Sequence, residues 1–340
     1  MPNQSPIKVA VVGVGAFGKN HARVYHELQQ QGGEVELVAV VDSDLSQAQA
    51  VARQFGCKAF TGIEELRGRV EAASVAVPTV HHLEVSAGLM ATGIDVLIEK
   101  PLATTLDEAD ELIRLANANQ RIAQAGHLER FNPAVRATLP LITRPMFFEV
   151  HRLSLFTPRS LDVDVVMDLM IHDIDVVLSM VNSPIKEIRA VGLAVVSGKV
   201  DIANVRMEFE SGCVANFTAS RVSTERVRKL RFFQPHEYIS VDYGRQDVLQ
   251  LRVASGQKLS AELLGSLESS PVPIPGVMMN KPAIQQEEPL LAELKSFIDA
   301  VRQRSNPVVP LGEGRRALAT ALNIVSAIAE HNRRAGLSSL

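Results

Sequence analysis

An apolar stretch, residues 9–12, runs directly into a turn with the pattern GxGxxG at residues 13–18. This order predicts a strand that feeds a dinucleotide-binding turn, in which each glycine has its own task. The first glycine permits the tight turn, the second lets backbone N–H groups approach a pyrophosphate, and the third lets the next helix pack closely. The N-terminus of that helix then faces an anion. The predicted cofactor contacts in this turn are Gly13, Gly15, Ala16, Phe17 and Gly18.

A second apolar stretch, residues 35–41, ends in Asp42, which lies 24 residues after Gly18. An acid at about this distance accepts hydrogen bonds from the ribose hydroxyls of the adenosine half of the cofactor. A glycine-rich turn can also serve only to cap a strand, and the aspartate favours the binding interpretation. Because its charge repels a 2′-phosphate, we expect NAD rather than NADP.

The first part of the chain alternates between strand and helix patterns, which predicts a doubly wound parallel sheet. We expect this Rossmann domain to cover residues 1–125. Further strands are expected at residues 72–77, 95–98 and 121–125, and helices at residues 19–31, 45–55, 83–91 and 107–119.

After Gly126 the strand patterns follow one another with few helices between them, which is typical of an antiparallel sheet. Since 340 residues exceed what one hydrophobic core usually supports, we expect a second, α+β domain over residues 126–340 with an open, mostly antiparallel sheet. This domain is expected to bind substrate and to mediate oligomerisation. Strands are expected at residues 146–155, 185–193, 203–210, 213–220, 227–234 and 238–242, helices at 165–180, 290–304 and 314–332, a hairpin turn at 210–212 and irregular chain at 255–286.

Composition narrows the class of protein. Hydrophobic residues make up 46% and the net charge is -3, which is ordinary for a globular enzyme and gives no overall basic balance for a nucleic-acid or membrane partner. The start of the chain lacks the pattern of a signal peptide, and no apolar run reaches the ~20 residues of a membrane span, so we expect a cytoplasmic protein. Cys57 and Cys213 form neither a metal-ligand spacing nor a disulfide framework.

Ligands of a doubly wound sheet bind beyond the carboxyl ends of its strands, so the residues there are the candidates for chemistry. Lys100 stands at such an end, before a proline, and a solvated lysine that ends a strand is the alternative interpretation. The residues predicted to bind cofactor after the third and fourth strands are Pro78, Thr79, His82, Glu99 and Lys100, and those predicted to bind substrate at the domain junction are Arg130 and Asn132.

Asp168 and His172 lie four residues apart on a predicted helix and therefore share one face. A carboxylate that orients an imidazole raises its basicity, as a general base acting on an alcohol requires. The alternatives are an ion pair on the helix surface and a metal site, and one histidine with carboxylates and no nearby thiol is a poor metal site.

Five basic residues cluster beyond a strand of the second domain: Arg221, Arg226, Arg228, Lys229 and Arg231. Such a cluster can bind a diphosphate. It can equally be a solvated edge that protects an exposed strand, or an oligomer contact. We take Arg221 and Arg228 as the candidate substrate contacts.

Taken together, these motifs resemble the Gfo/Idh/MocA oxidoreductase family over almost the whole chain. The resemblance rests on the glycine turn, Asp42, Pro78 with His82, the run Glu99-Lys100-Pro101, the run Arg130-Phe131-Asn132-Pro133 and the pair Asp168 and His172. It implies a Rossmann domain followed by a sheet domain, a bound nicotinamide cofactor, and oxidation of a sugar or cyclitol hydroxyl. It also implies that Lys100, Asp168 and His172 are the catalytic residues, without assigning the base to Lys100 or His172.

The runs at residues 164–175 and 126–133 are similar to those of dehydrogenases that oxidise the 3-hydroxyl of UDP-N-acetylglucosamine in lipid A synthesis. This likeness and the basic cluster imply a nucleotide sugar as substrate. One alternative is a dehydrogenase of a free sugar or inositol. Another is a non-catalytic regulator that binds NAD and a sugar, because the family includes a transcriptional repressor of galactose metabolism. A homodimer or homotetramer formed through the open sheet face is the expected assembly.

Overall fold

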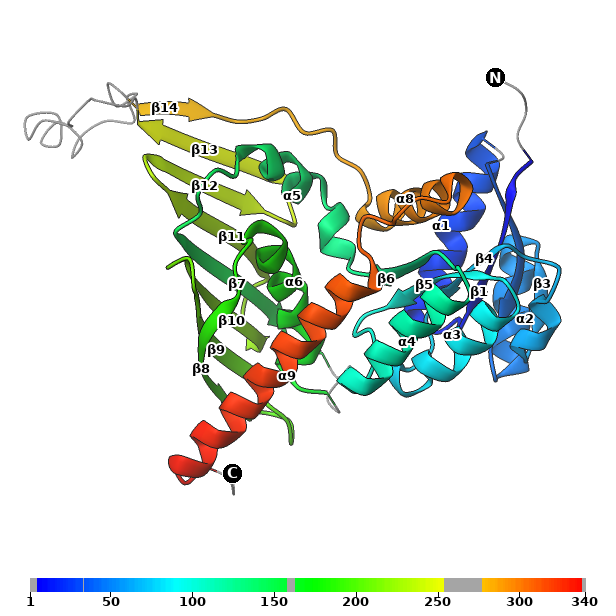
Figure 1. Ribbon diagram of the computed structural model, residues 1–340, viewed down its shortest axis with the longest axis horizontal. Helices are drawn as coiled ribbons and strands as arrows, with labels where there is room; N and C mark the ends of the chain where they lie inside the picture. The colour runs from blue at the N-terminus through cyan, green and yellow to red at the C-terminus, as the bar shows by residue number, and fades with distance from the viewer. Residues whose placement is uncertain (1–4, 33, 158–162, 254–276, 338–340) are drawn as a thin grey trace, which may run out of the picture. The chain divides into compact units, whose positions relative to one another are not determined.

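A computed structural model of the chain describes residues 5–32, 34–157, 163–253 and 277–337. The chain divides into two compact units (Figure 1). Unit 1 comprises Met1–Phe131 and Glu287–Thr320, and unit 2 comprises Asn132–Gln286 and Ala321–Leu340. The domain limits expected from the sequence, residues 1–125 and 126–340, stay a prediction.

Unit 1 contains a six-stranded sheet in the order β3-β2-β1-β4-β5-β6, with every neighbouring pair parallel. The doubly wound sheet is therefore confirmed. Its central strands are buried on both faces, which explains their nearly continuous apolar sequences. The strands are β1 (Ile7–Val12), β2 (Val35–Val41), β3 (Lys58–Phe60), β4 (Ala72–Val75), β5 (Asp95–Glu99) and β6 (Ala123–Gly126).

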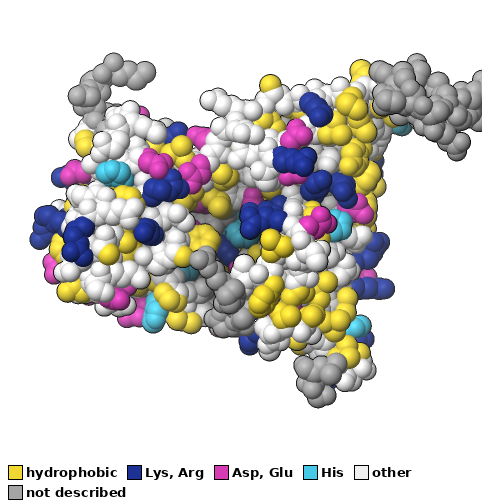
Figure 2. Space-filling model, turned by 180° about the vertical axis from the view of Figure 1, so that it is seen from behind, with side chains coloured by type: hydrophobic (Ala, Val, Ile, Leu, Met, Phe, Trp, Pro, Cys, Tyr) yellow, Lys and Arg dark blue, Asp and Glu magenta, His cyan; other side chains and the backbone are white. Residues whose placement is uncertain are grey.

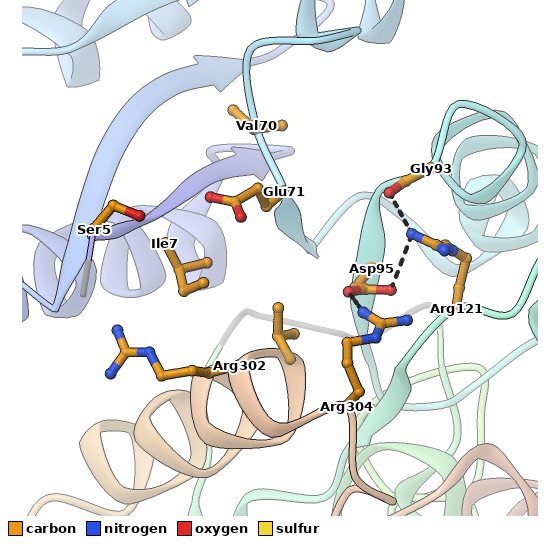
Figure 3. A pocket seen from close by; sticks show the side chains of 10 residues that line it. Ser5, Ile7, Val70, Glu71, Gly93, Asp95, Arg121, Arg302 and Arg304 are labelled. Atoms are coloured by element: carbon orange, nitrogen blue, oxygen red, sulfur yellow. Dashed lines mark hydrogen bonds and ion pairs between the residues drawn. The ribbon is translucent and has the colours of Figure 1, made fainter.

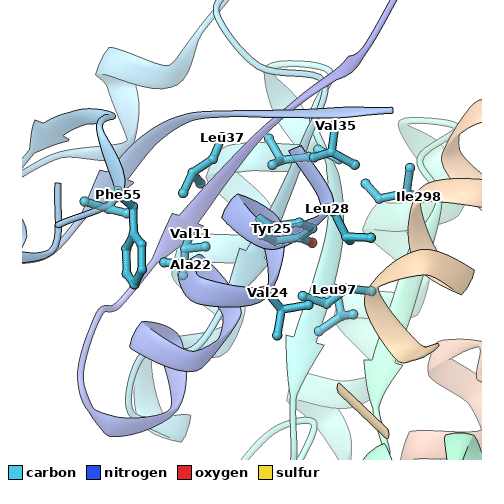
Figure 4. Close-up of a cluster of buried hydrophobic side chains, with 14 of the residues drawn as sticks. Val11, Ala22, Val24, Tyr25, Leu28, Val35, Leu37, Phe55, Leu97 and Ile298 are labelled. Atoms are coloured by element: carbon cyan, nitrogen blue, oxygen red, sulfur yellow. The ribbon is translucent and has the colours of Figure 1, made fainter. Parts of the chain in front are cut away.

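Helices cover both faces of this sheet (Figure 1). Side chains of α1, α2 and α8 share one buried apolar cluster with β1 and β2 (Figure 4), while α3 and α4 lie side by side on the other face. The sequence alone does not indicate which unit α8 packs against. The helices of unit 1 are α1 (Ala16–Gly32), α2 (Leu45–Phe55), α3 (His82–Ala91), α4 (Leu106–Ala118) and α8 (Pro289–Gln303), with short helical turns at Ile63–Leu66, Thr79–His81 and Leu128–Phe131.

Local sequence signals set where these helices begin and end. Asp44 caps α2 by accepting hydrogen bonds from the next turn, and Gly56 ends that helix in the left-handed conformation. Thr105 and Glu108 form a capping box at the start of α4. Each boundary therefore falls where the polar side chains satisfy backbone groups that the helix leaves unpaired.

Unit 2 contains an eight-stranded sheet in the order β14-β13-β12-β11-β7-β10-β9-β8. Among the described strands of this second sheet, the pairing of β7 with β10 is parallel and the others are antiparallel, so the expected, mostly antiparallel sheet is confirmed. The strands are β7 (Phe147–Leu155), β8 (Ile185–Leu193), β9 (Ile202–Phe209), β10 (Val214–Ser223), β11 (Val227–Gln234), β12 (Glu237–Asp242), β13 (Asp247–Val253) and β14 (Val277–Asn280).

The two faces of this sheet differ. On β7, Phe148 and Val150 are buried, whereas the alternate side chains Phe147 and Glu149 are partly exposed. The helices α5 (Pro133–Thr138) and α6 (Ile171–Met180) lie on the buried face (Figure 1). Among the described helices of unit 2, none covers the other face of this sheet, which we call the open face.

Several short elements were not expected from the sequence, namely β3, α5, β13, β14 and the turn Leu139–Leu141. Most of the irregular stretch predicted at residues 255–286 lies outside the described residues, which exclude 254–276, and the remainder contains β14. The last helix, α9 (Leu311–Arg334), begins in unit 1 and ends in unit 2. None of the described helices combines the length and hydropathy that a membrane span requires.

Candidate active site

The glycine turn after β1 fits the close approach of a dinucleotide. Gly13 has a φ of +83°, and a Cβ there would lie 2.7 Å from the backbone of Ala76. A Cβ on Gly18 would lie 1.7 Å from the carbonyl oxygen of Gly13. Gly15 has no atom within 4 Å of the Cβ position, so the space beside its backbone is open. Two glycines are therefore required by packing, and the third leaves room for a phosphate.

Asp42 is fixed at the carboxyl end of β2 by three hydrogen bonds. Its Oδ2 accepts from the backbone N–H of Val14 at 2.8 Å and from the side-chain amide of Gln47 at 2.8 Å. Its Oδ1 accepts from the backbone N–H of Asp44 at 3.0 Å. The carboxylate is thereby joined to the glycine turn, as the predicted contact with an adenosine ribose requires.

At the carboxyl end of β4, Pro78 is exposed, Thr79 is partly buried, and His82 is 1% exposed. The Nε2 of His82 lies 3.0 Å from the carbonyl oxygen of Val77, and its Nδ1 lies 3.1 Å from that of Pro101. Burial lowers the pKa of His82, although the surrounding carbonyl groups oppose this. The ring thus joins the segments that follow β4 and β5.

Glu99 and Lys100 end β5. One carboxylate oxygen of Glu99 lies 2.9 Å from the Nε2 of the fully buried His21 in α1. The other accepts a hydrogen bond from the backbone N–H of Lys100 at 3.3 Å. Lys100 is partly buried and precedes Pro101 in a cis peptide bond. Lys100 therefore stands at the carboxyl edge of the sheet, with Glu99 and His82 holding the chain on either side of it.

A cavity of about 550 Å³ in unit 1 lies at the opposite, amino edge of the sheet (Figure 3). There the buried Asp95 pairs with Arg304 and lies 3.7 Å from Arg121. Burial raises the pKa of Asp95, and these hydrogen bonds and charges oppose the rise. The arginines also donate to the carbonyl oxygens of Gly93 and Gln120 at the ends of helices. Because cofactors bind at the carboxyl edge, we assign this cavity a structural role.

In unit 2, Asp168 lies in a π-helical turn, Val166–Met170, that continues directly into α6 and His172. Asp164 starts this helix by accepting hydrogen bonds from the backbone N–H groups of Val166 at 2.9 Å and Met167 at 3.0 Å. Both Asp168 and His172 are partly exposed, as a reacting pair requires. A π-helical turn inside a helix is frequent at functional sites.

A buried ion pair fastens α6 to the sheet. Arg152 of β7 donates two hydrogen bonds to Asp173, at 2.7 Å and 2.8 Å, and both side chains are 3% exposed. The guanidinium also lies over the ring of Tyr243 at 5.3 Å from its centroid. Because Asp173 directly follows His172, this pair fixes the helix that carries the histidine.

The four predicted substrate contacts have different surroundings. Asn132 is buried and caps α5 through Ala134. Arg130 lies 3.5 Å from Glu313. Arg221 is 5% exposed, binds the carbonyl oxygens of Val163 and Val200, and has its Nε 3.4 Å from Asp201. Arg228 alternates with Lys229 on β11 and therefore points to the buried face of the sheet.

The predicted basic cluster is thus divided between the two faces of the sheet. Lys229 and Arg231 lie on the open face, where they are 3.9 Å from Asp242 and 3.5 Å from Glu149. Only Arg221 and Arg228 remain candidates for a substrate on the buried face. Charged side chains of both signs are likewise interspersed over the face seen in Figure 2.

Sequence reasoning missed three polar residues that support the candidate site: His21, Arg152 and Asp173. Helical spacing places His21 on the buried side of α1, where a histidine needs a polar partner. The partner, Glu99, is 78 residues away in sequence, so no local pattern identifies it. The same holds for Arg152 and Asp173, which are separated by 21 residues.

Fold and site define a Rossmann-type oxidoreductase with an NAD-binding domain, and sequence comparison identifies the family. The model of the oxidoreductase family with an NAD-binding Rossmann fold matches residues 7–127, and that of the GFO/IDH/MocA C-terminal domain matches residues 147–234. The chain belongs to the Gfo/Idh/MocA oxidoreductase family.

One relative is the UDP-N-acetylglucosamine 3-dehydrogenase of Acidithiobacillus ferrooxidans, with 35% identity over 95% of this chain and 97% of the relative. A solved structure of that enzyme superposes with a TM-score of 0.85, covering 96% of this chain and 98% of the other at 32% identity. An inositol 2-dehydrogenase of Rubrobacter xylanophilus is 31% identical over 55% of this chain and 56% of its own. A levoglucosan dehydrogenase in complex with NADH and L-sorbose has a TM-score of 0.80 at 16% identity and covers 96% and 98% of the two chains, so it shares the fold.

Proposed function

We propose that this enzyme oxidises the 3-hydroxyl of UDP-N-acetylglucosamine to a ketone with NAD as the hydride acceptor. The observation that carries the proposal is the 35% identity to a UDP-N-acetylglucosamine 3-dehydrogenase over 95% of the chain. The open glycine turn and the fixed Asp42 carboxylate support NAD as the cofactor. When bound, NAD supplies the acceptor for the hydride that leaves the sugar carbon.

In this proposal His172, oriented by Asp168, exchanges the proton of the hydroxyl that is oxidised, and Lys100 hydrogen-bonds the same oxygen. An ammonium group stabilises the negative charge that develops on the oxygen as the carbon loses its hydride. The position of Lys100 at the carboxyl edge of the sheet and the fastening of α6 by Arg152 support these roles.

Arg228 and Arg221 are proposed to bind the diphosphate of the nucleotide. The buried face carries the side chains that would meet substrate, and the direction of Arg228 on β11 supports its assignment there. Arg221 has a second, structural task, because it binds two backbone carbonyls. Arg130, near the end of the first segment of unit 1, and Asn132, the first residue of unit 2, remain proposed substrate contacts.

A second candidate is oxidation of a free sugar or inositol, favoured by the 31% identity to an inositol 2-dehydrogenase over 55% of the chain. Such a substrate has no use for a diphosphate site. The presence of Lys100, Asp168 and His172 together argues against a regulator that only binds ligands.

We also propose that the enzyme forms a homodimer or homotetramer through the open face. Phe147, Phe233 and Tyr238 form an aromatic cluster there, with ring centroids 5.7 Å and 5.2 Å apart. Partly exposed aromatic residues of this kind are enriched in protein interfaces. A cytoplasmic location and a role in lipid A synthesis complete the proposal. The free thiols of Cys57 and Cys213 fit a reducing compartment.

The roles of Lys100 and His172 are tested by the variants Lys100→Met and His172→Ala with UDP-N-acetylglucosamine and NAD. We expect the dissociation constant for NAD to change by less than about threefold and turnover to fall at least about a hundredfold, the usual scale for a lost acid or base. Full turnover in either variant would reject the role of that residue.

A further inference from the structure

The carboxylate of Glu99 lies in a niche that the surrounding elements build for it. A Cβ on Gly126, in the neighbouring strand β6, would lie 3.2 Å from the Cδ of Glu99 and 3.0 Å from its Cα. Only a glycine therefore leaves ordinary contact distance for this side chain. Within the niche the Glu99 side chain is 12% exposed, so few water molecules can solvate the carboxylate.

His21 supplies the hydrogen bond that the carboxylate needs there. The ring is completely buried, and its Nε2 lies 2.9 Å from Oε1 of Glu99. The other ring nitrogen, Nδ1, is buried and has no hydrogen-bond partner in the part of the chain that the structure describes. The ring therefore directs its only hydrogen bond to Glu99, so Nε2 carries the proton.

The charge of Glu99 bears directly on Lys100. Burial on its own raises the pKa of Glu99, but the hydrogen bond from His21 and the electrostatic interactions with His21 and Lys100 lower it overall. A Coulomb interaction is mutual, so an ionised Glu99 favours the charged ammonium of Lys100. The second oxygen of Glu99 also accepts a hydrogen bond from the backbone N–H of Lys100 at 3.3 Å, which holds the backbone of Lys100 beside the carboxylate.

Other titratable groups are close to this niche. His82, at the start of α3, experiences the charge of Glu99 and lies 3.1 Å from the carbonyl oxygen of Pro101. His127 directly follows Gly126, the partner of Glu99 in β6, and is buried. The ring nitrogens of His82 contact backbone carbonyl groups, whereas Nε2 of His21 contacts Glu99.

We propose that His21 is a positioning residue that keeps the Glu99 carboxylate ionised beside Lys100, so that Lys100 presents a charged ammonium to the hydroxyl that is oxidised. The inference rests on the proposed function for its effect on turnover. Its physical core, the ionised state of Glu99, holds whether or not the protein oxidises a sugar.

The chain offers a matched control one helical turn further along α1. Tyr25 is also completely buried, and its hydroxyl lies 3.0 Å from Oγ of Ser74 in β4. This pair joins the same helix to the same sheet through Ser74 of β4, whereas His21 does so through Glu99 of β5. Loss of the Tyr25 bond therefore reports the structural cost of removing a buried hydrogen bond at this interface.

The test compares full-length wild type with His21→Leu, His21→Gln, Glu99→Gln and Tyr25→Phe. Infrared spectra at neutral pH show a protonated carboxyl group by its C=O band, and the double variant His21→Leu/Glu99→Gln identifies which band of His21→Leu belongs to Glu99. We expect this band to be absent from the wild type, His21→Gln and Tyr25→Phe, and to appear in His21→Leu. An amide at position 21 can still donate to Glu99, so His21→Gln should restore the ionised state.

Turnover as a function of pH gives the second readout. The acidic limb should move up by at least about one pH unit in His21→Leu and stay in place in His21→Gln and Tyr25→Phe, because an unpaired buried carboxylate protonates more readily. Glu99→Gln should lower turnover at least about tenfold at every pH. A stable His21→Leu variant with an ionised Glu99, or a fully active Glu99→Gln variant, would overturn the inference. If no sugar is oxidised at all, the infrared result still decides it.

Discussion

The backbone N–H of Val14 donates a hydrogen bond to the Asp42 carboxylate at 2.8 Å, so the acid that follows β2 is joined to the glycine turn that follows β1. Gln47 donates to the same oxygen from α2. The negative charge is therefore held in one place before a cofactor arrives. A prearranged carboxylate can accept both ribose hydroxyls and repels an additional phosphate.

Replacement of Asp42 by alanine should narrow the preference for NAD over NADP by at least about tenfold, since a hydrogen bond to a charged group contributes about 1.5 to 3 kcal/mol. Calorimetric dissociation constants for both cofactors measure this ratio. Asp247→Ala, which changes an exposed acid at the start of β13, should leave it unaltered. Tighter binding of NADP than of NAD by the wild type would refute the assignment.

Two glycines of the same turn should respond differently to an added methyl group. In Gly18→Ala the new Cβ would lie 1.7 Å from the carbonyl oxygen of Gly13, so we expect a loss of at least about 3 kcal/mol in the free energy of unfolding. Gly15→Ala meets no atom within 4 Å and should fold normally, yet bind NAD more weakly. Urea denaturation and calorimetry separate the two effects. A Gly18→Ala variant as stable as the wild type would contradict the packing argument.

The sequence predicted the elements whose patterns are local and periodic. The strand that precedes Gly13 and the helix that carries His172 both appear where apolar spacing indicated them. It did not predict β3, which has only three residues, or the parallel pairing of β7 with β10. Length and periodicity carry no information on such pairings, because they depend on contacts between distant segments.

The candidate site shows the same limit. Spacing singled out Lys100, Asp168 and His172, since each follows a strand or lies on a recognisable helix face. It missed His21, whose partner Glu99 is brought to it only by the fold. It also grouped Arg228 with Arg231 as one cluster, although strand alternation places these two residues of β11 on opposite faces of the sheet. Adjacency in sequence does not decide what a side chain contacts.

Asp201 should make folding stability depend on pH at the acid end. Burial raises the pKa of Asp201 by itself, but the Ser197 hydroxyl and the backbone N–H groups of Val196, Val195 and Ser197 lower it to about 2. The ionised form is therefore favoured by folding, and this contribution is complete above about pH 4 and lost as the pH falls toward 2. The difference from the ordinary value corresponds to roughly 2 kcal/mol.

Asp201→Asn should accordingly lower the free energy of unfolding by roughly 1 to 2 kcal/mol at pH 7, with the difference from wild type shrinking below about pH 4. Denaturant unfolding at a series of pH values measures it. Asp247→Asn, at an exposed position, is the control. A difference that stays constant from pH 7 to pH 3 would show that the lost stability does not come from this ionisation.

Arg228→Ala should raise the Michaelis constant for UDP-N-acetylglucosamine about ten- to a hundredfold with little change in turnover, because contacts with a diphosphate are made equally in the ground and transition states. Arg231→Ala is the matched control, since its guanidinium lies 3.5 Å from Glu149 on the open face. Arg221→Ala should also lose stability, because the side chain is 5% exposed and binds two carbonyl oxygens. Unchanged kinetics in Arg228→Ala would remove it from the substrate site.

The most direct measurement is the rate of NADH formation by the purified protein with UDP-N-acetylglucosamine, compared with free N-acetylglucosamine and myo-inositol at equal concentrations. Binding energy from the nucleotide should make kcat/KM for the UDP sugar at least about a hundredfold higher than for the two free compounds. This factor corresponds to the free energy of one or two hydrogen bonds to charged groups. Mass spectrometry of the product should show the loss of two hydrogen atoms from the sugar. Oxidation of free N-acetylglucosamine or inositol as fast as the UDP sugar would contradict the assignment of a nucleotide-sugar dehydrogenase.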